Sequence, residues 1–200
     1  MLAAAAAVVT LALAVVSLVA ILSPAQHTRA PAAQFDGPLM PPGLPAARFS
    51  LPDQAGRQAT LSQYRGRVLI ISFMYSHCRD ACPLMATEIR GALDELPDAG
   101  REIPVLAISV DPKHDTRRSA AGFLAREQMT GRMRFLLGSR RQLAPIWKHY
   151  AIQPGEQHSA YVFLVDRHGL LRVGYPASQL IPEDLAHDLR LLLDRAAVGS

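Results

Sequence analysis

The sequence contains little of what marks several large classes of protein. It has 2 cysteines among 200 residues, so no network of disulfides replaces a hydrophobic core. Charged residues make up 19% of the chain and apolar residues 50%, which excludes a disordered chain, and glycine follows no fibrous repeat. After residue 22 no apolar run is long enough to cross a bilayer, which excludes a multi-pass membrane protein.

The excess of basic over acidic residues is also small. There are 21 Lys and Arg against 17 Asp and Glu, which gives a formal net charge of +4. No cluster of Lys and Arg alternates with aromatic residues, as a nucleic-acid footprint would require. We therefore interpret the charge as a solvated surface and expect no nucleic-acid partner.

Residues 1–22 form the one long apolar run, in which Thr10 and Ser17 are the only polar side chains. As a helix this run would be about 33 Å long, and the bilayer core is about 30 Å thick. A cleaved signal peptide is the alternative, but its apolar region is normally about 7–15 residues long. We expect a single transmembrane helix, and either interpretation exports the rest of the chain to the extracytoplasmic (periplasmic) side of the cell membrane.

Six prolines punctuate residues 23–45. Repeated proline removes backbone donors and favours extended chain, so this segment is predicted to be a Pro/Ala-rich linker and not a packed element. The soluble domain is then expected over residues 46–197.

Two uninterrupted apolar runs, residues 68–74 and 105–110, are typical of strands buried on both faces. Between them leucine and isoleucine recur at helical spacing, which predicts a strand–helix–strand unit of a parallel sheet. The remaining expected elements are a hairpin over 48–51 and 59–61, helices over 117–128 and 139–150, a hairpin over 160–165 and 170–174, and a helix from Pro182. This order is that of the thioredoxin-like fold, an α/β architecture whose central mixed sheet of four or five strands is flanked by helices.

Cys78 and Cys82 follow the first predicted central strand directly, where open α/β sheets place their functional sites. A spacing of four residues puts both sulfurs on one face of a turn. We expect Asp80 to cap the following helix, whose free N–H groups would favour the thiolate form of Cys82, as would the neighbouring Arg79. A structural disulfide is an alternative, but it would close a short loop and stabilise the chain little.

His158 precedes the predicted strand over residues 160–165, which in thioredoxin-like folds runs beside the first central strand. The loop that leads into it should therefore face the two cysteines, and the proline that thioredoxins carry there is absent. Two thiolates and one imidazole suit copper, above all Cu(I), whereas a closed zinc site needs four protein ligands. The predicted metal ligands are Cys78, Cys82 and His158.

Three separated motifs resemble the Sco/SenC family of copper-binding cytochrome c oxidase assembly proteins. The family's Cys-Pro-Asp-x-Cys-Pro loop is matched by Cys78, Asp80, Cys82 and Pro83, with Arg79 at the first proline. Its Ser-Val-Asp-Pro-x-x-Asp-Thr-Pro motif is matched by Ser109, Val110, Asp111, Pro112, Asp115 and Thr116, with Arg117 at the last proline. Its His-Ser pair is matched by His158 and Ser159, although the stretch from Ile152 to His158 is shorter than the family's usual loop.

The resemblance implies copper binding by the three predicted ligands, and delivery of copper to, or thiol reduction at, the copper site of cytochrome c oxidase subunit II. We interpret Asp111 and Asp115 as structural, bonding local backbone N–H groups and capping the next helix, because Cu(I) disfavours oxygen ligands. An exported thiol–disulfide oxidoreductase that uses Cys78 and Cys82 without a metal remains the alternative. A thiol peroxidase fits less well, because the upstream Pro and Thr of peroxiredoxins are missing.

Overall fold

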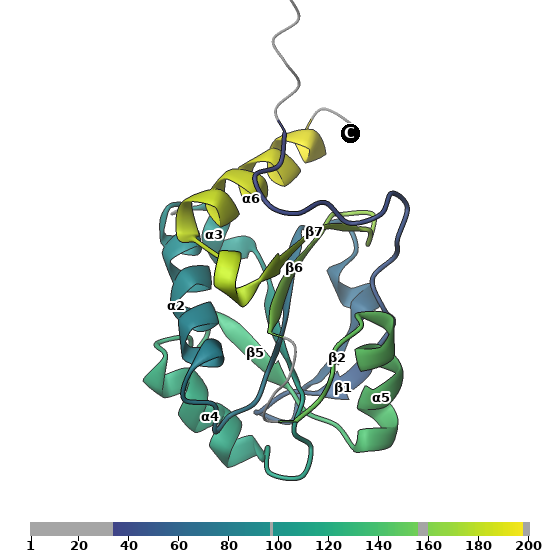
Figure 1. Cartoon of the computed structure of the whole chain (residues 1–200), viewed down its shortest axis with the longest axis vertical. Helices are drawn as coiled ribbons and strands as arrows, with labels where there is room; N and C mark the ends of the chain where they lie inside the picture. Colours follow the sequence, from purple (N-terminus) through teal and green to yellow (C-terminus); the bar gives the residue numbers. More distant parts are fainter. Residues whose placement is uncertain (1–33, 97, 156–159, 198–200) are drawn as a thin grey trace, which may run out of the picture. The chain divides into compact units, whose positions relative to one another are not determined.

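The apolar run after residue 68 forms β3 (Leu69–Met74), the middle strand of a five-stranded sheet in the computed structural model of the chain (Figure 1). The structure describes residues 34–96, 98–155 and 160–197. The strand order is β5-β4-β3-β6-β7, with β3 parallel to β4, β4 parallel to β5, and the β3–β6 and β6–β7 pairs antiparallel. The other strands are β4 (Val105–Ser109), β5 (Met133–Leu136), β6 (Tyr161–Val165) and β7 (Leu171–Pro176). The predicted mixed sheet with its central strand pair is confirmed.

Both faces of the sheet are covered, since alternate side chains of β3 enter two separate cores. Ile70 and Met74 face α2 (Ala81–Asp94), α4 (Arg117–Arg126) and α6 (Pro182–Ala197). Ile71 and Phe73 face α5 (Arg140–His149) and the hairpin of β1 (Ser50–Pro52) and β2 (Gln58–Thr60). The short elements are η1 (Leu61–Tyr64), α3 (Ala99–Glu102) and η2 (Ala177–Gln179).

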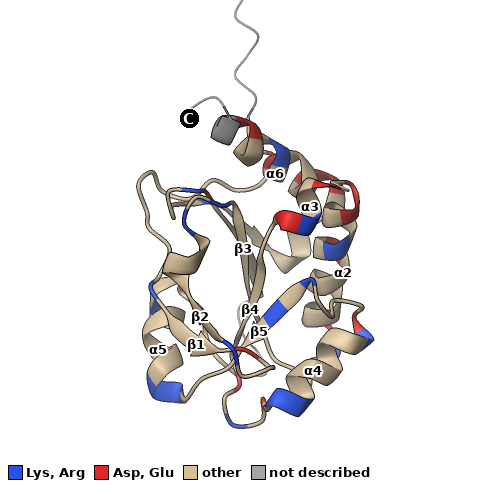
Figure 2. Ribbon diagram, turned by 180° about the vertical axis from the view of Figure 1, so that it is seen from behind, with Lys and Arg blue, Asp and Glu red and all other residues tan. Residues whose placement is uncertain are grey.

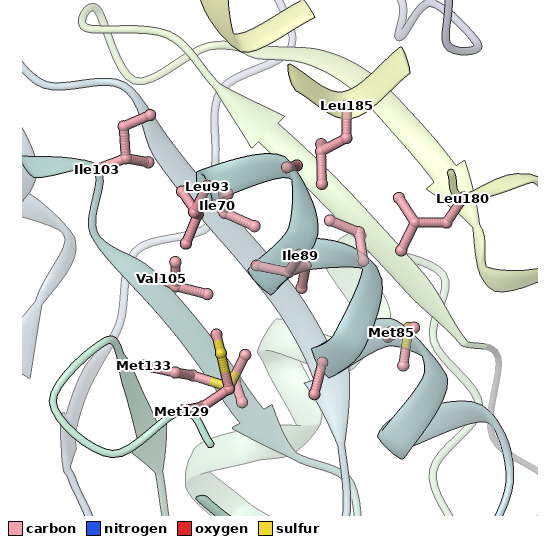
Figure 3. Close-up of a cluster of buried hydrophobic side chains, with 14 of the residues drawn as sticks. Ile70, Met85, Ile89, Leu93, Ile103, Val105, Met129, Met133, Leu180 and Leu185 are labelled. Atoms are coloured by element: carbon pink, nitrogen blue, oxygen red, sulfur yellow. The ribbon is translucent and has the colours of Figure 1, made fainter. Parts of the chain in front are cut away.

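Helix α2 is held on the sheet by one apolar stripe. Met85, Ile89 and Leu93 recur at intervals of four residues and pack in the same core as Ile70 of β3, with Ile89 and Leu93 nearest to it (Figure 3). Each is at most 2% exposed, and burying such a side chain contributes about 1.5–3 kcal/mol. This packing fixes the start of α2, and with it the loop that carries the cysteines.

The prediction of an unpacked linker up to residue 45 is wrong for residues 34–45. This segment runs along the outer edge of β7, where Met40 N–H donates to Arg172 O (2.9 Å) and Leu171 N–H donates to Leu44 O (2.8 Å). The buried Asp188 carboxylate accepts hydrogen bonds from the backbone N–H groups of Asp36 (2.8 Å) and Gly37 (3.1 Å). The prolines are tolerated because they lie on an edge, where a missing backbone donor costs little.

The predicted anchor, residues 1–22, and the linker up to residue 33 lie outside the described residues. Within the part of the chain that the structure describes, no helix has the length and apolar character needed to span a membrane.

Candidate metal centre

The two cysteines meet where β3 ends and α2 begins. Both are thiols that are not joined in a disulfide; Cys78 is 8% exposed and Cys82 is fully buried. The backbone N–H of Cys82 donates to Cys78 Sγ at 3.3 Å. The Cys82 thiol also donates a hydrogen bond to Cys78 Sγ, which confirms the predicted convergence of the two sulfurs, and the two are not joined in a disulfide.

The sulfur of Cys78, and not the carboxylate of Asp80, caps α2. Asp80 is the residue before the helix, but its side chain makes no capping hydrogen bond. Instead Cys78 Sγ accepts hydrogen bonds from the backbone N–H groups of Asp80 and Cys82. The expectation that Asp80 caps the helix is wrong, because the loop brings a sulfur to the position that a capping oxygen normally takes.

The same contacts reverse the predicted ionisation of the pair. A hydrogen bond from the Cys82 thiol, together with the two backbone N–H groups and a bond from the Tyr75 side chain, lowers the pKa of Cys78 to about 5. Donating that hydrogen bond and complete burial raise the pKa of Cys82 far above its ordinary value. Sequence reasoning placed the thiolate on Cys82 because that residue lies in the first turn of α2. The structure places it on Cys78, the sulfur toward which the donors point.

The half-buried carboxylate of Asp115 ties the cysteine loop to the neighbouring strand. Asp115 Oδ1 accepts hydrogen bonds from the backbone N–H (2.8 Å) and the hydroxyl (2.6 Å) of Ser76, and Oδ2 accepts from the Ser109 hydroxyl at 2.6 Å. Thr116, not an aspartate, caps α4 by accepting from Ser119 N–H. Asp115 is therefore a positioning residue for the loop, which agrees with its structural interpretation, and Ser76 is a partner that the sequence analysis did not single out.

The exposed side of Cys78 opens into a cavity of about 600 Å³ between the loop and α4. Its lining includes three arginines, Arg79, Arg118 and Arg126, and the bare backbone of Gly122. A reagent or partner can therefore reach Cys78 from this side, while Cys82 lies behind it in the core.

His158 lies outside the described residues, as do the other members of the segment 156–159, so its place as a third ligand stays a prediction. The flanks of that segment are described. Gly155 N–H donates to Val110 O at 3.1 Å, just past the end of β4, and Ala160 O accepts from Ala177 N–H at 2.9 Å.

Three of the described histidines make contacts away from the cysteine loop. His114 Nδ1 pairs with Asp111 at 2.7 Å, and His149 Nε2 lies 2.8 Å from Pro45 O. His187 lies with Asp36 and Asp188 near the start of the described chain, a group whose hydrogen bonds hold residues 36 and 37 on α6.

Comparison with known proteins points to one family. The sequence model of the SCO1/SenC family matches residues 42–194. The human mitochondrial protein "SCO1 homolog" is 28% identical over 123 residues, which cover 59% of this chain and 40% of the human protein. Peroxiredoxin Bcp of Escherichia coli is 36% identical over only 75 residues, 38% of this chain and 47% of that protein. The chain thus spans about half the length, or less, of these curated relatives.

Among solved structures, Bradyrhizobium japonicum ScoI with copper bound superposes with a TM-score of 0.65 at 27% identity. The match covers 74% of this chain and 98% of ScoI. The family match takes in both cysteines, the Asp115 network and His158, which together form the pattern described above. The chain belongs to the SCO1/SenC family.

Proposed function

We propose that this chain is a copper carrier, which binds one copper ion through the sulfurs of Cys78 and Cys82 and the imidazole of His158, and passes it to an acceptor protein. The observation that carries the proposal is the meeting of two reduced thiols at the end of the sheet, where the pKa of Cys78 is lowered to about 5. Thiolates select Cu(I) over hard cations. A related structure at 27% identity, ScoI, holds copper, which supports the same cargo here.

The choice of His158 as third ligand is supported by the residues on either side of it. Val110, to which Gly155 is bonded, directly follows β4, and β4 runs parallel to β3. Tyr161 begins β6, whose register pairs Val162 with Ser72 near the end of β3. The chain therefore enters and leaves the segment 156–159 at the end of the sheet that carries the cysteine loop.

The proposal is tested by anaerobic titration of the reduced chain with Cu(I) against a competing chelator. We expect one ion per chain, and weaker binding by at least about tenfold in His158→Ala, since even residues that only orient metal ligands contribute that much. His168→Ala is the matched control, because His168 lies in the β6–β7 turn at the other end of the sheet and should leave the affinity as it is. Equal affinity in the wild type and His158→Ala would remove His158 from the site.

A thiol–disulfide exchange activity is the second candidate, and the ionised Cys78 beside a protonated Cys82 favours it. In this reaction the Cys78 thiolate attacks a partner disulfide and expels one partner thiolate. Cys82 then loses its proton, attacks Cys78 Sγ and releases the second. His158→Ala separates the two candidates, because it should weaken copper binding and leave the exchange rate within about twofold.

The acceptor is proposed to be the copper site of cytochrome c oxidase subunit II, which the family membership supports. Residues 1–22 are proposed to anchor the protein in the cell membrane with the folded domain on the periplasmic side. The anchor is tested by alkaline extraction of membranes and by the intact mass of the extracted chain. Release of the protein in a form shortened at the N-terminus would indicate a cleaved signal peptide instead.

A further inference from the structure

The charged residues that line the cavity beside Cys78 are three arginines and one glutamate. Arg118, Gly122 and Arg126 recur at intervals of four residues and therefore share one face of α4, and Arg79 extends the basic lining from the cysteine loop. Glu127 is the one acidic residue among those described that line the cavity. Figure 2 shows basic residues, drawn in blue, at both ends of α4.

The three arginines are held differently. Arg126 is fixed in place, because its Nη2 donates to Ser76 O at 3.0 Å and its guanidinium lies 5.9 Å from the centre of the Phe123 ring. All three arginines are exposed, and Arg79 and Arg118 extend from the two sides of the cavity. Exposed guanidinium groups present paired donors that match the geometry of a carboxylate.

Gly122 lies between Arg118 and Arg126 on α4 and, having no side chain, leaves the cavity open at that point. A Cβ at this position would meet only Arg126 Nη1, at 3.6 Å, so the helix backbone itself forms part of the cavity wall. The volume of about 600 Å³ lies within the range of clefts that hold small molecules and short peptide segments.

We propose that this cavity docks an acidic polypeptide segment of the partner, whose carboxylates meet Arg118 and Arg79 while its cysteine faces Cys78. The inference rests on the proposed function, because it specifies the chemistry of the protein that meets the two thiols. The arginines offset the repulsion between the Cys78 thiolate and an anionic partner, and they raise the local concentration of that partner.

The test uses the reduced, copper-free chain at pH 7.5 and three short peptides, each with one cysteine in a mixed disulfide with 2-thiopyridine and flanked by Glu, Gln or Lys. The Cys78 thiolate attacks the peptide sulfur, so a Cys78–peptide disulfide forms, the bond to the pyridine sulfur breaks, and pyridine-2-thione leaves. Its absorbance gives the rate. At low salt we expect the Glu peptide to react about tenfold faster than the Gln peptide, with the difference shrinking in high salt.

Two arginine variants decide where the preference arises. Arg118→Gln should lower the ratio of Glu-peptide to Gln-peptide rates by about threefold or more. Arg65→Gln, which removes the same charge just after η1 at the other end of the sheet, should leave that ratio as in the wild type. Equal rates for all three peptides, or equal effects of the two variants, would overturn the proposal.

Gly122→Leu supplies an independent check, because it fills the cavity without changing the charge. We expect it to lower the rate with the Glu peptide relative to the rate with iodoacetamide, and an unchanged ratio would refute docking in the cavity. The peptide assay contains no metal, so its result does not depend on copper binding. A failed peptide assay would refute docking of an acidic segment and leave the copper proposal standing, and a failed copper titration would do the reverse.

Discussion

Replacing Cys82 with alanine tests the origin of the reactive thiolate. The hydrogen bond from the Cys82 thiol is the largest contribution that lowers the pKa of Cys78 to about 5. A hydrogen bond to a charged group contributes about 1.5–3 kcal/mol, and one pH unit corresponds to about 1.4 kcal/mol. We therefore expect Cys82→Ala to raise the pKa of Cys78 by about one to two pH units, still below that of an ordinary thiol because the backbone donors remain.

The measurement is the rate of alkylation by iodoacetamide as a function of pH. In the wild type the rate should be flat from about pH 7 upward and fall by half near pH 5, because Cys78 is ionised above that point while the buried Cys82 stays protonated. Cys82→Ser is the matched control, since its hydroxyl keeps a donor beside Cys78. A wild-type midpoint near pH 8.5, or the same midpoint in Cys82→Ala and the wild type, would refute this account of the site.

Four further outcomes follow from the described contacts, each measured by urea denaturation of the reduced chain. Because folding lowers the pKa of Cys78, the unfolding free energy of the wild type relative to Cys78→Ser should rise between about pH 5 and about pH 9 and be lost as the pH falls through about 5. Asp115→Ala should cost about 2–4 kcal/mol, because three buried donors lose their acceptor, and Asp115→Asn should cost less. Asp188→Ala should cost a similar amount and also expose residues 34–45 to limited proteolysis. Ala151→Gly should stabilise the chain by about 1 kcal/mol, since Ala151 has φ +53° just after α5.

The sheet core could be predicted because its strands have simple patterns. The runs at β3 and β4 are apolar on both faces, and α2 has an apolar stripe at helical spacing, so neither needed tertiary information. The sequence analysis did not predict β5, because its four residues, MRFL, are too few to show a strand pattern. It is recognised as a strand only from its pairing with β4 in the structure. The packing of residues 34–45 on β7 was missed for a similar reason. The proline content of a segment predicts how it behaves in isolation. It does not show that the fold offers the segment a free sheet edge, as β7 does, or a buried carboxylate such as that of Asp188.

The candidate site shows a second limit of sequence reasoning. The spacing of Cys78 and Cys82 predicted that their sulfurs meet, and this is confirmed by the hydrogen bond between the two side chains. Which sulfur ionises depends on the direction of individual N–H and S–H groups, which spacing does not encode. The hydrogen bond that Ser76 donates to Asp115 spans 39 positions of the chain, and it too could be found only from the three-dimensional structure.

The capping of α2 by a sulfur links the chemistry of Cys78 to the order of the helix that follows. A metal ion or a second sulfur bound to Cys78 would compete for the same lone pairs that hold the amides of Asp80 and Cys82. The first turn of α2 would then be less ordered when Cys78 is bound to a metal ion or a second sulfur, and more ordered when Cys78 is unbound. Amide hydrogen exchange at these positions would report whether the protein is loaded or empty, and a partner that reads the shape of this turn could tell the two forms apart.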